Sequence, residues 1–243
     1  MKNSNIRLLL HRIRYTPFHP QWFAYRYEKL RYVETGKIAQ GKILDIGCGR
    51  QVLPQYLKTS TTYVSLDFPE TGKKLYHANP HIFGDASKLP FKDGSFDTVV
   101  MLEVLEHLPN PRTALQEACR VLKKNGQIIL STPFLYPIHD SPHDYQRWTL
   151  HGLDRILSFQ GMTRRQHLTM GTPIESGVLL FNLSLAWSTL NSSIAGRFFL
   201  MCLSIILIPL FNILGYLVSS LSKVPVASPF AIGYLLVVQE SKQ

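Results

Sequence analysis

Two glycines and two acidic residues are spaced as a nucleotide-binding site requires. Gly47-Cys48-Gly49 directly follows a short apolar run that contains Asp45, and small residues there let backbone N–H groups approach a ligand. Asp67 lies twenty residues after Gly47, at the end of the next apolar run, where a carboxylate can accept both hydroxyls of a ribose. A nicotinamide dinucleotide site favours glycine or alanine at position 52, which holds Val52. The spacing favours a nucleotide-type ligand and disfavours a nicotinamide cofactor.

These residues lie on a predicted alternation of strands and helices. Apolar and β-branched runs predict strands at 42–46, 63–67, 81–83, 96–102, 127–132, 163–170 and 230–239. Helices are predicted to begin at Val52, at Pro111 and after the N-cap Thr149. This alternation predicts an α/β fold with a doubly wound, mostly parallel sheet, whose ligands bind at the carboxyl ends of the strands. The chemistry is therefore expected just after strands one, two, four and five.

Several ordered motifs resemble class I S-adenosylmethionine-dependent methyltransferases of the bacterial type-11-like kind. The match begins at Ile43–Gly49 and continues through Gly84–Ala86, Ser95–Val100 and Glu103–Leu108. It covers most of residues 40–170 and resumes at 230–240. The family's first motif often has a third glycine, where this chain has Gln51. The resemblance implies a Rossmann-like seven-stranded sheet and S-adenosyl-L-methionine as the cofactor.

The resemblance also implies which residues bind the cofactor. They are Asp45, Gly47, Cys48, Gly49, Asp67, Phe68, Asp85, Ala86 and Glu103. Asp85 would face the adenine amino group, Ala86 N–H would face a ring nitrogen, and Glu103 would help to position the amino acid end. A sulfonium carries its own activation, so the enzyme mainly holds donor and acceptor in line. No covalent nucleophile is needed, and Cys48 is expected to pack the loop as a small buried residue.

Histidines and a tyrosine are the candidates for chemistry on the acceptor. The candidate catalytic residues are His143, His139, Tyr145 and His107. The segment Pro142–Thr149 resembles loops that cover the active site in bacterial relatives. His139 or His143 is expected to act as a general base, because histidine titrates near neutrality, and Tyr145 to orient the acceptor.

The interpretation of Arg147 stays open between two partners. It either pairs with a phosphate or carboxylate of the substrate or forms a structural ion pair with Asp144.

Glu103, Glu106 and His107 form an E-x-x-E-H pattern. Some family members with this pattern hold a divalent metal together with a later histidine, for which His139 and His143 are available. The same stretch is frequent in metal-free relatives, so we expect no metal ligand and keep a divalent metal as the less favoured alternative.

Composition excludes two classes of protein. The 243 residues are 45% hydrophobic and 11% aromatic, which excludes a disordered chain, and three cysteines exclude a disulfide scaffold. Seven of the ten net positive charges lie in residues 1–42, together with seven aromatic residues from Tyr15 to Tyr32. This combination fits an anionic membrane surface or, less well, nucleic acid. A solvated helix packed on the domain is the alternative.

Two long uncharged stretches, 177–196 and 198–222, lie between the predicted sixth and seventh strands. The second is apolar enough to cross a bilayer, and the first is marginal. Because both flanking strands belong to one edge of the sheet, the insertion must leave and return on one side. We predict an apolar helical hairpin, either two spans or a pair within one leaflet. Arg197 and Pro209, which is expected to break the longer helix, favour the shallow arrangement. A soluble lid or a dimer surface is the alternative.

The sequence therefore predicts four regions. They are a basic aromatic arm and helix (1–40), a methyltransferase core (41–172), a hydrophobic helical insertion (173–226), and a final strand and tail (227–243). The predicted function is methylation, with O-methylation leading, of a membrane-associated lipid, quinone-like molecule or lipid-linked glycan, with the catalytic domain on the cytoplasmic side of the membrane. A non-catalytic membrane scaffold and a nucleic-acid methyltransferase are the alternatives.

Overall fold

The computed structural model describes residues 11–221 and 228–241. Its helices and strands are α2 (Trp22–Ile38), β1 (Lys42–Ile46), β2 (Thr62–Asp67), α3 (Pro69–Thr71), β3 (Ile82–Phe83), β4 (Phe96–Leu102), α4 (Pro111–Val121), β5 (Leu122–Pro133), α5 (Leu150–Ser158), β6 (Met162–Met170), α6 (Pro173–Asn191), α7 (Ile194–Ser220) and β7 (Gly233–Glu240). Short helical turns lie at Leu53–Tyr56, Gly72–Tyr76 and Leu105–His107. Two basic residues of the expected N-terminal arm, Lys2 and Arg7, lie outside the described residues.

The chain divides into two compact units. Residues 31–134, 138–168 and 233–243 form the sheet unit, and residues 1–30, 135–137 and 169–232 form the hairpin unit. The domain boundaries expected from the sequence, at 40, 172 and 226, stay a prediction beside this division.

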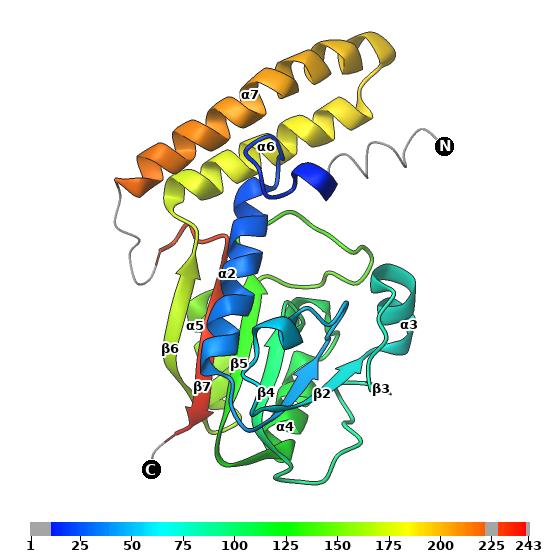
Figure 1. Cartoon of the computed structure of the whole chain (residues 1–243), viewed down its shortest axis with the longest axis vertical. Coiled ribbons are helices and arrows are strands. Elements are labelled where there is room, and N and C mark those ends of the chain that lie inside the picture. The colour runs from blue at the N-terminus through cyan, green and yellow to red at the C-terminus, as the bar shows by residue number, and fades with distance from the viewer. Residues whose placement is uncertain (1–10, 222–227, 242–243) are drawn as a thin grey trace. The chain divides into compact units, whose positions relative to one another are not determined.

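The sheet has seven strands in the order β3-β2-β1-β4-β5-β7-β6 (Figure 1). Strand β1 pairs in parallel with β2 and with β4, and β4 pairs in parallel with β5. Strand β7 pairs antiparallel with β5 and lies between β5 and β6. The predicted doubly wound α/β sheet, with the helical insertion between its sixth and seventh strands, is confirmed.

An apolar core fixes the central strands. Ile43 of β1, Val100 of β4 and Ile129 of β5 are fully buried in one cluster with Leu53 and Leu235. Central parallel strands are covered on both faces, which is why they are nearly continuous apolar runs rather than alternating ones. The predicted helices α4 and α5 are confirmed, and the Thr149 hydroxyl caps α5 by accepting the Gly152 N–H.

Two predicted features are wrong. The helix expected from Val52 is only the turn Leu53–Tyr56, because Leu57 is already extended and a Ser- and Thr-rich run of low helix propensity follows. Helix α7 also runs unbroken through Pro209. Its packing against α6 outweighs the local cost of a proline.

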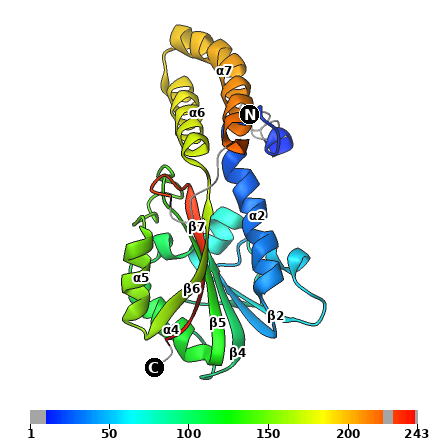
Figure 2. The same cartoon turned by 90° about the vertical axis from the view of Figure 1, so that its left-hand side faces the viewer.

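The hairpin unit consists mainly of α6 and α7, which run side by side in opposite directions (Figure 2). A capping box starts α6: the Thr172 hydroxyl accepts the Glu175 N–H, and the Glu175 carboxylate accepts the Thr172 N–H. At the start of α7 the Ser193 hydroxyl accepts the Gly196 N–H, without a reciprocal bond. Among the described helices, α7 alone is long and apolar enough to cross a membrane.

Candidate functional site

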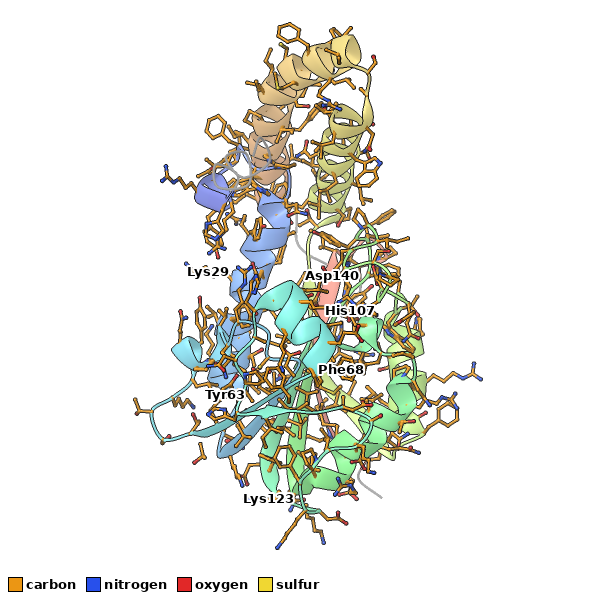
Figure 3. All side chains as sticks on the ribbon, turned by 90° about the vertical axis from the view of Figure 1, so that its right-hand side faces the viewer. Lys29, Tyr63, Phe68, His107, Lys123 and Asp140 are labelled. Atoms are coloured by element: carbon orange, nitrogen blue, oxygen red, sulfur yellow. The ribbon has the colours of Figure 1, made fainter. Side chains whose placement is uncertain are left out.

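The predicted site residues of the sheet unit follow the carboxyl ends of its parallel strands. Phe68 follows β2, His107 follows β4, and Asp140, the neighbour of the predicted His139, follows β5. Figure 3 shows these three residues at the end of the sheet unit opposite to Lys123, which belongs to the start of β5. This is the edge at which the sequence predicted the chemistry.

The loop after β1 requires its glycines. Gly47 and Gly49 have φ angles of 73° and 50°, a region that side chains rarely adopt. A Cβ atom at Gly47 would lie 2.5 Å from Val104, whereas one at Gly49 would meet no atom within 4 Å. Gly47 is therefore needed for packing, and Gly49 faces open space in which a ligand can approach the backbone.

Asp67 holds this loop. One carboxylate oxygen accepts the Gly49 N–H at 2.7 Å, and the other accepts the Phe68 N–H at 2.8 Å. The side chain is 5% exposed, and burial raises its pKa. The oxygen that accepts the Gly49 N–H also lies 3.8 Å from the Cys48 thiol, a weak donor, whereas the oxygen on the Phe68 N–H keeps a lone pair for a ligand hydroxyl.

Asp45 and Cys48 are buried supports of the loop. The Asp45 carboxylate accepts the Tyr63 hydroxyl at 2.6 Å, and burial raises its pKa to about 7. Burial also raises the pKa of the Cys48 thiol to about 12, so the thiol is not a nucleophile at neutral pH.

The other predicted cofactor residues lie on neighbouring strand ends. Phe68 is exposed, Asp85 is exposed with its carboxylate on the Ser87 N–H, and Ala86 is buried. Glu103 has a φ of 54°, and its carboxylate accepts the Ser131 hydroxyl at 2.9 Å. It also pairs with the Arg31 guanidinium at 3.0 Å.

A cluster around the fully buried Glu106, called the buried cluster, follows Glu103, and its two histidines are half-buried. One ligand-type atom from each of Glu106, His107 and His139 lies within 4.8 Å of the other two. The Glu106 side chain is fully buried, and neither carboxylate oxygen has a hydrogen-bond partner. Burial, and then the nearby charge of Glu103, raise the pKa of Glu106 well above its usual value. An unpaired carboxylate in such a place is costly, so the cluster is a candidate for holding a proton, an acceptor group or a cation.

The imidazole of His107 is held in one orientation. Its Nδ1 lies 2.9 Å from the His143 carbonyl oxygen, so Nδ1 carries the proton and Nε2 is an acceptor. Burial lowers its pKa, which keeps the ring neutral at pH 7. The His139 ring lies 5.0 Å from it, edge to face, and His139 Nδ1 lies 3.2 Å from Asp144.

The four predicted catalytic residues form two groups rather than one. His107 and His139 lie in the buried cluster, whereas His143 is half-buried and Tyr145 exposed on the following loop, with His143 Nδ1 3.4 Å from the Tyr145 hydroxyl. Backbone contacts connect the groups, because the Tyr145 N–H donates to the Glu106 carbonyl.

Of the two interpretations of Arg147, the structural ion pair is confirmed. Both terminal nitrogens of its guanidinium bind the Asp144 carboxylate. Burial opposes ionisation of Asp144, but Arg147 and His139 lower its pKa to about 2.

Sequence reasoning missed several residues at this edge. The sequence places Arg31 only in the basic N-terminal region, yet its guanidinium binds the Glu103 carboxylate. Glu106 was considered only as a metal ligand, and Tyr76 was not considered, although its hydroxyl donates to Asp140. Only Glu106 gave a signal in the sequence, as an acidic residue in an otherwise apolar turn. The other contacts join distant segments, which local patterns do not reveal.

Comparisons with known proteins agree with this geometry. Residues 44–130 match the family model described as Methyltransferase domain. Ubiquinone biosynthesis O-methyltransferase of Dechloromonas aromatica is 32% identical over 108 residues, which are 39% of this chain and 45% of that protein. Demethylmenaquinone methyltransferase of Streptomyces avermitilis is 36% identical over 94 residues, which are 37% of this chain and 41% of that protein. The chain thus spans less than half the length of these curated relatives.

The fold has solved counterparts. The crystal structure of a SAM-dependent methyltransferase from Methanosarcina mazei has a TM-score of 0.51 at 14% identity, and the match covers 85% of this chain and 96% of that one. At this identity the likeness concerns the fold alone, and it confirms the predicted Rossmann-like sheet of the class I type.

Proposed function

We propose that this chain, which carries a class I methyltransferase domain, moves a methyl group from S-adenosyl-L-methionine to an oxygen atom of a membrane-associated acceptor. A quinone-like ring is the favoured acceptor, within a wider class of lipids and lipid-linked glycans. One observation carries the proposal: the Gly47–Gly49 loop held by Asp67, and the buried cluster of Glu106, His107 and His139, follow the carboxyl ends of neighbouring strands. Relatives named for ubiquinone and demethylmenaquinone methylation support the acceptor class.

The residues present fit a nucleoside sulfonium. Open space at Gly49 admits a ligand to the backbone, and the Asp67 carboxylate suits a ribose. Phe68, Asp85 and Ala86 would hold the base, and Glu103 the amino acid end. When bound, the cofactor supplies an already activated methyl group, so the protein has to align the acceptor with it.

The buried cluster supplies what the acceptor needs. A phenolic hydroxyl becomes a good nucleophile when it loses its proton, and a neutral imidazole is a suitable base. His107 keeps Nε2 as an acceptor, and Glu106 stabilises the imidazolium that forms. His139 shares this role, while His143 and Tyr145 orient the acceptor from the exposed loop.

The hairpin unit supports a membrane location. It exposes large apolar side chains, and the basic residues of positions 1–42 favour the anionic cytoplasmic face. The sheet unit would then work on the cytoplasmic side, on an acceptor dissolved in or attached to the bilayer.

Two measurements test the activity. Calorimetry with the purified full chain is expected to show that it binds S-adenosyl-L-methionine and the demethylated product of that cofactor. Labelled methyl is expected to appear in a lipid-soluble product when the protein is mixed with membrane extracts. Asp67→Ala should weaken cofactor binding about 10- to 100-fold, because charged hydrogen bonds of about 1.5–3 kcal/mol are lost. Asp93→Ala, at an exposed carboxylate paired with Arg120, is the matched control.

The outcomes separate the alternatives. Absence of cofactor binding would refute the proposal. Binding without turnover on any extract would indicate a scaffold, and labelled nucleic acid would indicate the other methyltransferase class. Loss of turnover with a chelator would show that Glu106, His107 and His139 hold a cation; one carboxylate and two imidazoles suit zinc or a similar ion.

A further inference from the structure

The outer surface of α7 is apolar along its length, whereas the less apolar α6 exposes Ser184 and Ser188 beside Phe181 and Trp187. Phe198 and Phe199 lie near the start of α7, Ile205 and Ile206 in its middle, and Leu217 near its end, all of them more than half exposed. Only 17% of the most apolar part of α7 is buried. The core helix of a water-soluble domain would hide such a face, so this surface needs an apolar surrounding.

The inner surface of the pair carries polar side chains beside the buried Leu179 and Ile208. The Asn182 amide donates to the Asn212 side chain at 2.9 Å, and Asn212 donates to the carbonyls of Pro17 and His19. Ser219 donates to the Glu175 carboxylate at 3.2 Å. Apart from the Asn182 carbonyl oxygen, these buried groups find partners inside the unit, as a hydrocarbon surrounding requires.

The two ends of the pair carry arginines and aromatic rings. At the base, the Arg26 guanidinium lies 4.7 Å from the Tyr216 ring centroid and 5.1 Å from that of Trp22. At the turn, Trp187 is 70% exposed, and Arg197 donates to the carbonyls of Leu190 and Ser192. Arginine, tryptophan and tyrosine are the residues that favour the two interfaces of a bilayer.

The distance between these ends matches a whole bilayer. Nineteen residues separate Arg197 from Tyr216 along α7, which is about 28 Å at 1.5 Å per residue. Helix α6 has 19 residues and the same length. The hydrocarbon layer is about 30 Å thick. A hairpin confined to one leaflet would instead leave Arg197 and the exposed Asn191 and Ser193 within hydrocarbon.

We propose that α6 and α7 cross the entire bilayer as a two-span hairpin, with the turn at 191–197 on the far surface. This rests on the membrane location given under the proposed function, and it replaces the shallow arrangement that Arg197 suggested in the sequence. Nine Lys and Arg residues lie in the sequence at 1–42, against a single arginine at the turn, and this asymmetry favours the cytoplasmic side for the base, where Arg26 packs. Both ends of the insertion return to one side, since the Ile232 N–H donates to the Met170 carbonyl.

Cysteine accessibility tests the crossing. In the full chain with Cys48, Cys119 and Cys202 replaced by alanine, Ser193→Cys places a thiol at the turn and Ser220→Cys places one at the base. Asn191→Cys repeats the turn position without touching the Ser193 cap. Each variant is expressed in a bacterial host, checked by circular dichroism, and treated with a membrane-impermeant maleimide in spheroplasts and in inverted membrane vesicles.

The crossing predicts opposite labelling of the two ends. The turn thiols should react in spheroplasts and be protected in inverted vesicles at least tenfold, and the base thiol should do the reverse. Protection of the turn thiols in both preparations would overturn the crossing and leave the membrane location intact. Labelling of both ends in inverted vesicles only, or recovery of the protein in the soluble fraction, would overturn the crossing; the soluble fraction would also remove the membrane location. Methyl transfer is measured separately, so its failure is distinguishable from either result.

Discussion

The two units of this chain differ in what their longest apolar segments bury and expose. In the sheet unit, Ile43, Val100 and Ile129 are fully buried, as in a protein that folds in water. In the hairpin unit, Asn182 and Asn212 are fully buried, while Phe198 and Ile206 are about two-thirds exposed. The same physical rule gives both results if the first unit is surrounded by water and the second by hydrocarbon. The kind of side chain that a unit buries therefore indicates whether water or hydrocarbon surrounds it.

The contrast predicts that an isoleucine-to-alanine substitution lowers the free energy of unfolding by different amounts in the two units. Ile129→Ala should destabilise the sheet unit by about 2–5 kcal/mol, because it opens a cavity in a closed core. Ile206→Ala is the matched control on the outer face of α7 and should cost less than about 0.5 kcal/mol. Thermal unfolding in mild detergent, followed by circular dichroism, measures both. Equal costs would mean that the outer face of α7 is packed against protein.

The polar interior of the hairpin unit predicts the next largest effect. Asn212→Leu should destabilise the helix pair by about 1–2 kcal/mol, because two carbonyls and the Asn182 amide lose their partner. Asn191→Leu, at the exposed turn, should be nearly neutral. The midpoint of unfolding in a titration with denaturing detergent compares the two variants. If Asn212→Leu stabilised the helix pair, the interior of the hairpin unit would favour apolar side chains, as that of the sheet unit does. The proposed difference between the two units would then be wrong.

Glu106 is the exception inside the sheet unit, and it predicts the smallest effect. A buried acid whose pKa is raised by folding binds its proton more tightly in the folded state, so stability falls as pH rises above the usual pKa. Glu106→Gln in metal-free protein should therefore raise stability by about 1 kcal/mol at pH 8 and remove this slope, while methyl transfer falls.

Glu117→Gln is the control for that change. Its carboxylate pairs with Arg120, which lowers its pKa, so its loss should reduce stability at pH 8. The free energy of unfolding, measured at pH 5 and pH 8, shows whether Glu106→Gln and Glu117→Gln change stability in opposite directions. If Glu106→Gln destabilised the protein, the role of Glu106 would be to stabilise the fold and not to take part in methyl transfer.

Local signals in the sequence predicted most of the fold. The strands, the Pro111 and Thr149 helix starts, and the inserted apolar hairpin each depend on residues within a few positions of one another. The end of the helical turn at Leu57 agrees with the Ser- and Thr-rich run that follows it, a local signal that the prediction did not use. The unbroken passage of α7 through Pro209 depends on packing against α6, which spacing does not show.

The candidate site divides along the same line. The glycine loop and Asp67 were predictable because their positions follow from strand ends. The pairs Arg31–Glu103 and Tyr76–Asp140 were not, since each joins segments more than sixty residues apart. The unpaired state of Glu106 is a property of its surroundings, which only the structure contains.

The position of β7 has a consequence for the synthesis of the protein. Strand β5 ends at Pro133, but its partner β7 begins at Gly233, after the whole hairpin has been made. At about 5–20 residues per second, β5 leaves the ribosome roughly 5–20 seconds before β7 exists. Strand β6 lies beside β7 in the sheet, so it cannot join the sheet until β7 has also been made. If the hairpin crosses the bilayer as proposed, it can enter the lipid before the sheet closes, and each molecule would then be anchored before it could bind its cofactor.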